Sequence, residues 1–182
     1  MSNTQSLYEL LKEQEQDAEV SDSGLCLEKW RELGENGASI PMKIPLHGRS
    51  MEPLIKSERE LVTILPLVRD PLVGDIVLFR RADGKNIVHR VYRVFQDGIQ
   101  TLGDNCRRPD EPISQKDIFG IIVSVEKKGK TYQLDTKQQR TNGIRWIKYG
   151  RPVWIEVQKI KAIGGTLIRK VYPDFHRSGK VS

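Results

Sequence analysis

The fold is decided by residues 74–102, which read GDIVLFRRADGKNIVHRVYRVFQDGIQTL. β-Branched and aromatic residues recur here in three short runs, and Asp-Gly pairs at 83–84 and 97–98 separate the runs. Glycine takes the positive φ that tight hairpin turns require, so each Asp-Gly pair is a hairpin signal. The stretch therefore predicts three antiparallel strands, at 75–81, 86–95 and 98–102.

The same pattern of short apolar runs separated by turn residues continues on both sides of this stretch. Further short runs rich in Val, Ile and Leu lie between Gly, Pro and Asp, and a Lys-Gly pair at 128–129 marks one more hairpin. Because most connections are hairpins, we expect a mainly β domain, a coiled antiparallel sheet without βαβ crossovers, over residues 40–135. Its further strands are predicted at 42–46, 61–66, 118–127 and 130–134.

Two helical arms are predicted to flank this domain. Residues 1–39 are expected to form an acidic N-terminal arm with short helices at 5–20 and 25–33. Residues 136–182 are expected to form a basic extension with an amphipathic helix that starts near Pro152. The ordinary role of its apolar stripe is packing on the core, and docking on anionic lipid is the alternative.

Charge is distributed unevenly along the 182 residues, whose net charge is +6. Residues 1–40 contain nine acidic and three basic side chains, whereas residues 127–182 contain 14 basic and three acidic ones. A tail this basic could contact nucleic acid, an anionic membrane or the acidic arm of its own chain. The arm lacks the third helix that a DNA-reading helix-turn-helix domain would need, so nucleic acid is the least favoured partner. Peripheral membrane contact stays a candidate.

The sequence also bears on compartment and cofactors. It contains no run of 18 apolar residues, and its start is polar and acidic rather than basic and apolar. We therefore expect a cytoplasmic protein, with membrane association through the basic helix as an option. Cys26 and Cys106 have no CxxC spacing, so we expect two unpaired thiols and neither a disulfide framework nor a metal or other cofactor.

Two residues suggest nucleophilic chemistry. Ser50 lies in IPLHGRSMEPLI at 44–55, between a glycine-containing turn and a proline that restrict the backbone around its hydroxyl. A serine nucleophile needs a base within about 3 Å and donors for the oxyanion. His89, in the predicted strand NIVHRVYRV, could supply the base. Taken alone, the serine could stand in an ordinary turn and the histidine could be a surface or core residue.

Several separate blocks of sequence together resemble the type I signal peptidases in order and approximate spacing. The resemblance covers residues 40–126 and implies a serine peptidase with a coiled β-domain. Bacterial housekeeping members and self-cleaving repressors carry a lysine base, whereas the archaeal and endoplasmic-reticulum branch carries histidine. Since His89 stands at that position, the chain resembles the serine-histidine branch, which implies Ser50 as nucleophile and His89 as base. The blocks are SMEP at 50–53, GDIVLFR at 74–80, IVHRV at 87–91, LGDN at 102–105 and DIFGIIVSV at 117–125.

The resemblance also implies that an aspartate assists the histidine. The candidates are Asp104 and Asp110, and we prefer Asp110 as the group that orients the imidazole, with Asp104 holding the neighbouring loop. With an ordinary pKa near 6.5, the imidazole is expected to be mostly neutral at pH 7. Lys85 is a less favoured base because it lies at a predicted hairpin tip, and His47 is expected at the rim of the site.

The expected function is therefore that of a serine endopeptidase that cuts a peptide or leader sequence through an acyl-enzyme, with small apolar side chains near the cut, as the resemblance implies. Two alternatives stay open. A self-cleaving repressor would need an Ala-Gly or Cys-Gly bond upstream of the core, and neither dipeptide occurs in residues 1–40. A non-catalytic binding or regulatory module could use the same fold.

Overall fold

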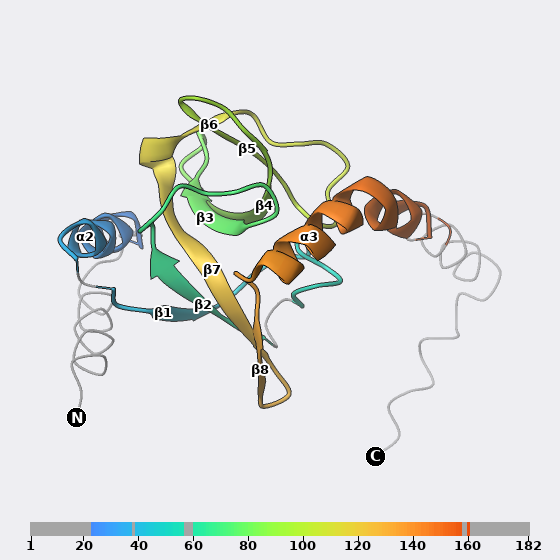
Figure 1. Ribbon diagram of the computed structural model, residues 1–182, viewed down its shortest axis with the longest axis horizontal. Helices are drawn as coiled ribbons and strands as arrows, with labels where there is room; N and C mark the ends of the chain where they lie inside the picture. Colours follow the sequence, from blue (N-terminus) through green and yellow to red (C-terminus); the bar gives the residue numbers. More distant parts are fainter. Residues whose placement is uncertain (1–22, 38, 57–59, 158–159, 161–182) are drawn as a thin grey trace, which may run out of the picture.

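The chain folds into one strongly curled antiparallel sheet with helices at two opposite sides (Figure 1). The computed structural model describes residues 23–37, 39–56, 60–157 and 160. Its strands run in the order β1-β2-β7-β3-β4-β5-β6, and β8 pairs with β7. The strand bounds are Met42–Pro45 (β1), Leu61–Pro66 (β2), Ile76–Arg80 (β3), Asn86–Val94 (β4), Gly98–Leu102 (β5), Ile113–Ser114 (β6), Ile118–Lys127 (β7) and Lys130–Gln133 (β8).

The predicted antiparallel β-domain is confirmed, and each predicted strand is present within one residue or so of its expected ends. The hairpins β3–β4, β4–β5 and β7–β8 turn where the glycine pairs indicated. The sequence pattern did not predict β6, because two residues are too few to show alternation. β7 is the central strand: it pairs with β2, β3 and β8, and this pairing curls the sheet upon itself.

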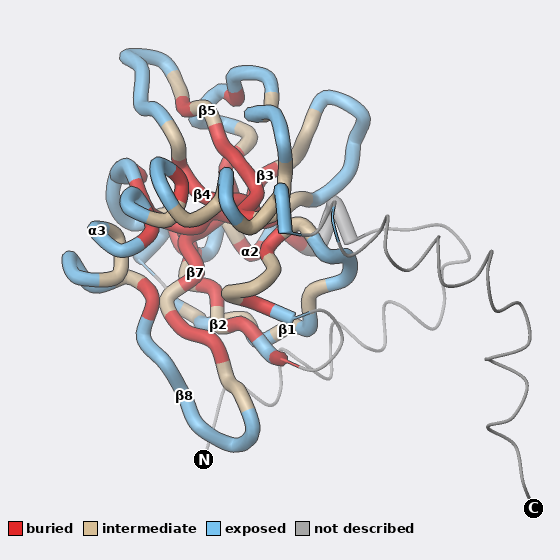
Figure 2. Tube along the Cα trace, turned by 90° about the vertical axis from the view of Figure 1, so that its right-hand side faces the viewer, coloured by how far each residue is buried: buried red, intermediate tan, exposed pale blue. Residues whose placement is uncertain are grey.

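The curled sheet has apolar side chains packed on both of its faces. One cluster lies towards α2 and includes Ile64, Val88 and Phe119, while the second includes Phe79 and Val91. Val88 and Val91 belong to the same strand, β4, yet they are buried in different clusters. The strands β3, β4 and β7 therefore form the buried centre of the molecule (Figure 2). A side chain on either face of β4 is shielded from water, which sets the environment of His89.

The helix α2, Ser23–Glu35, covers the sheet on one side. Its side chains Leu27 and Trp30 are buried against the sheet, and the Trp30 indole Nε1 donates a hydrogen bond to the Ile40 carbonyl at 2.9 Å. The helix predicted at 25–33 is thus confirmed and is slightly longer than expected. The helix predicted at 5–20 lies outside the described residues.

The C-terminal helical segment differs from its prediction in where it begins. The helix α3 spans Lys137–Arg145, a π-helical turn follows over Trp146–Gly150, and helix continues through residues 151–157. Pro152 therefore stands inside the helical path rather than at its start. In a regular α-helix its ring would clash with the carbonyl four residues earlier, and the wider π-turn directly before it accommodates the ring.

Packing of the C-terminal helix also differs from the expectation. Ile147 is buried and Trp154 is half-buried, but Val157 and Ile160 of the predicted stripe are exposed. The expectation that this stripe packs on the core is wrong for those two residues, and its continuation beyond residue 160 lies outside the described part of the chain. Within that part, no helix combines the length and apolar character needed to span a membrane.

Trp30 and Leu33 offer a test of how α2 stabilises the sheet. Trp30 is 3% exposed, so Trp30→Ala should lower the free energy of unfolding by about 3–5 kcal/mol, because a large cavity and an unpaired carbonyl replace the indole. Leu33 belongs to the same helix but is 38% exposed, so Leu33→Ala should change the free energy of unfolding by about 0.5 kcal/mol or less. Urea unfolding measures both. Equal losses would mean that α2 is not anchored through Trp30.

Candidate active site

His89 and Asp110 form a close and nearly buried pair. The His89 side chain projects from the middle of β4, and its Nδ1 lies 2.6 Å from Asp110 Oδ2. The two side chains are 7% and 13% exposed. A histidine held by a carboxylate at Nδ1 presents its Nε2 to the other side, with the ring orientation fixed. This is the arrangement that a general base requires.

Asp110 is itself held in place from β5. The Thr101 hydroxyl donates to Asp110 Oδ2 at 2.7 Å, and the Asp110 backbone N–H donates to the Thr101 carbonyl at 2.9 Å. Gln100 Nε2 donates to the Asp110 carbonyl at 2.9 Å. Thr101 is fully buried, and sequence reasoning missed it. The position of Thr101 directly before the LGDN block was the available signal.

Asp104 has a different partner. It accepts two hydrogen bonds from Arg90, with Nε to Oδ1 at 2.8 Å and Nη2 to Oδ2 at 2.7 Å, and Arg90 Nη1 donates to the Gly74 carbonyl at 3.0 Å. Both side chains are almost completely buried. Of the two candidate aspartates, Asp110 therefore contacts the imidazole, and Asp104 pairs with Arg90, the residue after His89 in β4.

Ser50 lies in the turn that follows β1, and the loop after β5 holds it next to His89. The Asn105 backbone N–H donates to the Ser50 carbonyl at 2.8 Å, and its side-chain amide donates to the Arg49 carbonyl at 3.1 Å. A Cβ placed on Gly103 would lie 2.9 Å from both His89 Nε2 and the Ser50 carbonyl oxygen. Those two atoms are thus at most twice that distance apart. Glycine at this position permits the close approach of the Ser50 turn to the imidazole.

Cys106 is the second side chain at His89 Nε2. Its Sγ lies 3.9 Å from that nitrogen, and the same Cβ position on Gly103 would be 2.5 Å from the sulfur. Cys106 is a free thiol, as expected, while the side chain of Cys26 lies outside the described residues. Contact of Cys106 with the imidazole was not predicted, although its position directly after the LGDN block could have indicated it.

The C-terminal helical segment contacts the loop at 103–110, which carries Asp104, Asn105 and Cys106. Trp154 Nε1 donates to Asn105 Oδ1 at 3.0 Å, Arg151 Nη1 donates to the Cys106 carbonyl at 2.6 Å, and Trp146 Nε1 donates to the Asp104 carbonyl at 3.3 Å. These three contacts, which we call the loop clamp, were not predicted. Donor side chains repeated at helical spacing were their only sequence signal.

The environment of His89 changes its protonation. Burial of the ring favours the neutral form, but the hydrogen bonds to Asp110 and Cys106 and the negative charge of Asp110 outweigh it and raise the pKa of His89 from 6.5 to about 9. Burial alone would raise the pKa of Asp110, yet its hydrogen bonds to His89 and Thr101 lower it. The expectation of a mostly neutral imidazole at pH 7 therefore does not hold in this structure, and the free protein carries a His89–Asp110 ion pair at neutral pH.

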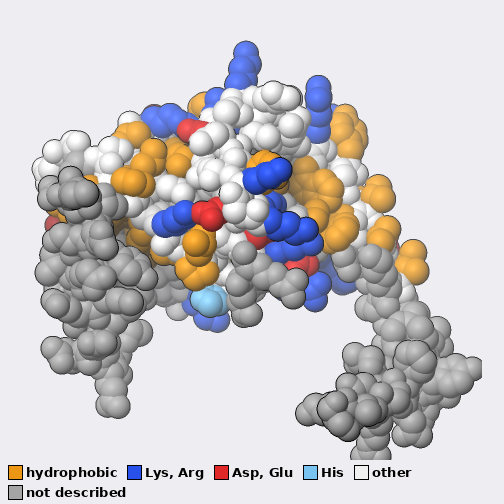
Figure 3. Space-filling view, turned by 90° about the horizontal axis from the view of Figure 1, so that it is seen from below, with side chains coloured by type: hydrophobic (Ala, Val, Ile, Leu, Met, Phe, Trp, Pro, Cys, Tyr) orange, Lys and Arg blue, Asp and Glu red, His pale blue; other side chains and the backbone are white. Residues whose placement is uncertain are grey.

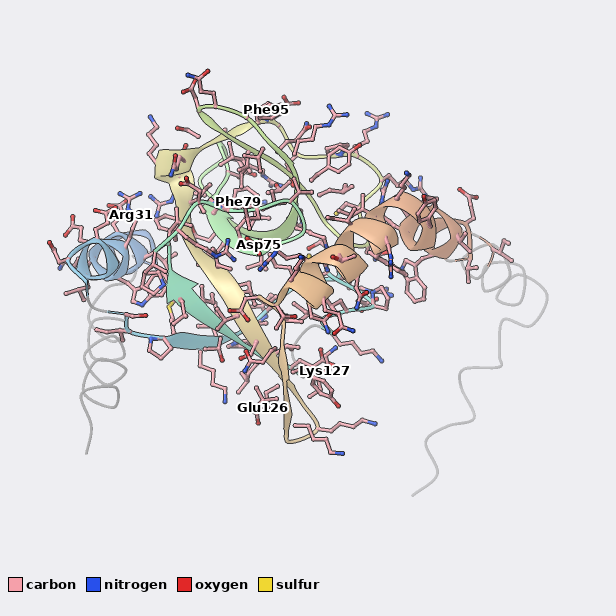
Figure 4. All side chains as sticks on the ribbon, in the orientation of Figure 1. Arg31, Asp75, Phe79, Phe95, Glu126 and Lys127 are labelled. Carbon is pink, nitrogen blue, oxygen red and sulfur yellow. The ribbon has the colours of Figure 1, made fainter. Side chains whose placement is uncertain are left out.

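Other titratable side chains that were considered for the site lie away from this pair or outside the described residues. Lys85 and His47 are exposed, and His176 lies outside the described residues. Asp75 is buried between the sheet and α3, where it pairs with Arg69 at 2.6 Å and with Arg140 at 3.5 Å (Figure 4). It is therefore a structural anchor at the start of β3. Among the residues that the structure describes, no cluster of His, Cys, Asp and Glu could hold a metal ion.

Comparison with known proteins adds no further constraint. No protein-family model matches the sequence, and a search of curated proteins finds no match. The functional interpretation therefore depends on the resemblance of the sequence blocks and on the geometry of the described site.

Asp104 and Asp97 test the structural role of the buried ion pair. Asp104→Ala leaves the Arg90 guanidinium buried without its partner, so the free energy of unfolding should fall by about 3–5 kcal/mol. Asp97→Ala, at an exposed position in the β4–β5 turn, should change it by about 0.5 kcal/mol or less. Chemical denaturation measures the free energy of unfolding of both variants. A tolerated Asp104→Ala would mean that Asp104 does not anchor the loop.

The raised pKa of His89 can be tested by NMR titration of its ring proton. We expect a midpoint near pH 9 in the wild type and a lower midpoint in Cys106→Ala, because the interaction of His89 with Cys106 favours the imidazolium. Since the folded pKa exceeds 6.5, the pair stabilises the fold fully below that pH and loses this contribution as the pH rises through about 9. His47, which is exposed, provides the reference signal. A midpoint near 6.5 would contradict the ion pair.

Proposed function

We propose that this protein is a serine endopeptidase of the signal peptidase type, with Ser50 as nucleophile, His89 as general base and Asp110 as the residue that orients the imidazole. The 2.6 Å contact between His89 and Asp110, with the Ser50 turn held close to the other imidazole nitrogen, Nε2, is the observation that supports it most strongly. A histidine that is bound to a carboxylate at one nitrogen and faces a serine turn with the other suits acyl transfer.

The proposed chemistry proceeds in two halves. His89 Nε2 takes the proton of the Ser50 hydroxyl as its oxygen attacks the scissile carbonyl, and the imidazolium then gives this proton to the leaving amine, which releases the C-terminal product. Water, deprotonated by the same nitrogen, attacks the acyl-enzyme, and Ser50 leaves with the proton. Backbone N–H groups around Ser50 are the proposed oxyanion donors, because Gly48 stands where some signal peptidases have a serine donor.

The sheet offers a place for an extended substrate. β1 is the terminal strand of the sheet path and pairs with β2, and the chain runs from its last residue, Pro45, directly to the Ser50 turn. A peptide that adds to this edge as another strand would lead its scissile bond towards Ser50. Small apolar side chains next to the cut are part of the proposal and derive from the resemblance.

The protonation of His89 sets the expected pH dependence of this reaction. A general base must be neutral, and the imidazole is mostly protonated at pH 7 because its pKa is about 9. If substrate leaves this pKa unchanged, the rate of acylation should therefore increase with pH up to about 9.

A fluorophosphonate probe tests the nucleophile. We expect the wild-type protein to be labelled, and Ser50→Ala and His89→Ala to lose labelling by at least about a hundredfold, because each removes a partner of the proton transfer. Ser114→Ala, which removes an exposed hydroxyl from β6, should label normally. Labelling is measured by mass spectrometry of the intact protein, and circular dichroism verifies folding.

Cys106→Ala belongs in the same experiment because the thiol also lies at His89 Nε2. It should retain labelling if Ser50 is the nucleophile. Equal labelling of the wild type, Ser50→Ala and His89→Ala would contradict catalysis by this site. If hydrolysis of a peptide library depended on Cys106 rather than on Ser50, the nucleophile would be the thiol.

A further inference from the structure

We propose that the outer face of the C-terminal helical segment docks onto an anionic membrane surface. Exposed large apolar side chains recur along this segment, and four of them, which we call the outer stripe, follow one another at spacings of three or four residues. Their exposed fractions are 63% for Tyr149, 65% for Val153, 37% for Val157 and 68% for Ile160. Positions three or four apart in a helix share one face, so the four side chains lie together.

The opposite side of the same segment is already occupied. Ile147 is buried, and Arg151 and Trp154 contribute to the loop clamp. The segment thus has an inner side fixed to the domain and an outer side on which the outer stripe meets solvent. In the part of the chain that the structure describes, nothing covers the outer stripe. Figure 3 shows apolar side chains gathered on the right-hand flank of the molecule.

Charge around the outer stripe favours anionic lipid as its partner. Arg145 and Lys148 are exposed next to it, and Lys148 Nζ lies 5.2 Å from the centre of the Tyr149 ring. Residues 145–182 contain nine basic and two acidic side chains, of which Glu156 belongs to the helix. Lipid phosphates attract such a cationic segment, while tyrosine and branched aliphatic side chains enter the interface between headgroups and acyl chains.

The form of this surface also favours a membrane over a protein groove. The outer stripe is narrow, lies on a helix at the flank of the domain and is bordered by flexible cationic side chains. An interfacial helix has this composition, with a shallow apolar face and Lys or Arg beside it. The lysine stems can cover the apolar edge while their charged ends reach the phosphates. The proposal does not depend on peptidase activity.

Vesicle flotation tests the proposal with the full-length protein. We expect the wild type to float with phosphatidylcholine vesicles that contain phosphatidylglycerol, to bind weakly to phosphatidylcholine alone, and to dissociate as salt increases. Val153→Asp and Ile160→Asp should each reduce the bound fraction on the order of tenfold, because a carboxylate then faces the lipid. The matched control is Val68→Asp, since Val68 lies in the β2–β3 connection with the same 65% exposure and should leave binding unchanged.

Three results would overturn the proposal. The first is no binding of the wild type to the anionic vesicles. The second is equal binding of Val153→Asp, Ile160→Asp and Val68→Asp, which would leave only non-specific attraction by the basic tail. The third is a change of oligomeric state in Val153→Asp, measured by sedimentation without lipid, together with unchanged flotation, which would assign the outer stripe to a contact between copies. Thermal unfolding of each variant verifies that the domain is intact.

Discussion

The buried ion pair between Arg90 and Asp104 is the constraint on which the rest of this structure depends. A charge removed from water is costly unless hydrogen bonds satisfy it, and the paired guanidinium and carboxylate provide these for each other. His89, which directly precedes Arg90 in β4, points to the other face of the strand and holds Asp110. Two neighbouring strand residues therefore fix both ends of one short loop, from Gly103 to Asp110, and this loop holds the Ser50 turn and carries Cys106 close to the imidazole.

Most of the sheet could be predicted from local sequence rules. Alternating apolar residues and glycine-containing turns determine strands and hairpins within a few residues, so the strands of residues 61–102 and 118–133 were accessible without tertiary information. β6 was not, because its two residues form a strand only by pairing with β5. The start of α3 was missed for a different reason: Pro152 indicated a helix beginning, whereas a π-turn places it inside a longer helical path.

The candidate site was only partly predictable. The order of the sequence blocks indicated Ser50, His89 and the preference for Asp110, because these residues lie within recognisable motifs. The loop clamp could not be predicted, since its donors are some forty residues from the carbonyls and amide oxygen that they contact and no motif links them. The protonation of His89 was also inaccessible. It results from the balance between burial and two neighbouring groups, and burial is known only after folding.

The loop clamp has a consequence for the order in which the protein matures. Ribosomes extend a chain from its N-terminus, and domains begin to fold during synthesis. The strands of the sheet and the loop at 103–110 are complete before Trp146, Arg151 and Trp154 have been added. A nascent chain therefore carries its serine, imidazole and carboxylate well before the last three supporting side chains emerge from the exit tunnel, and all contacts of the loop clamp can form only after residue 154 has emerged.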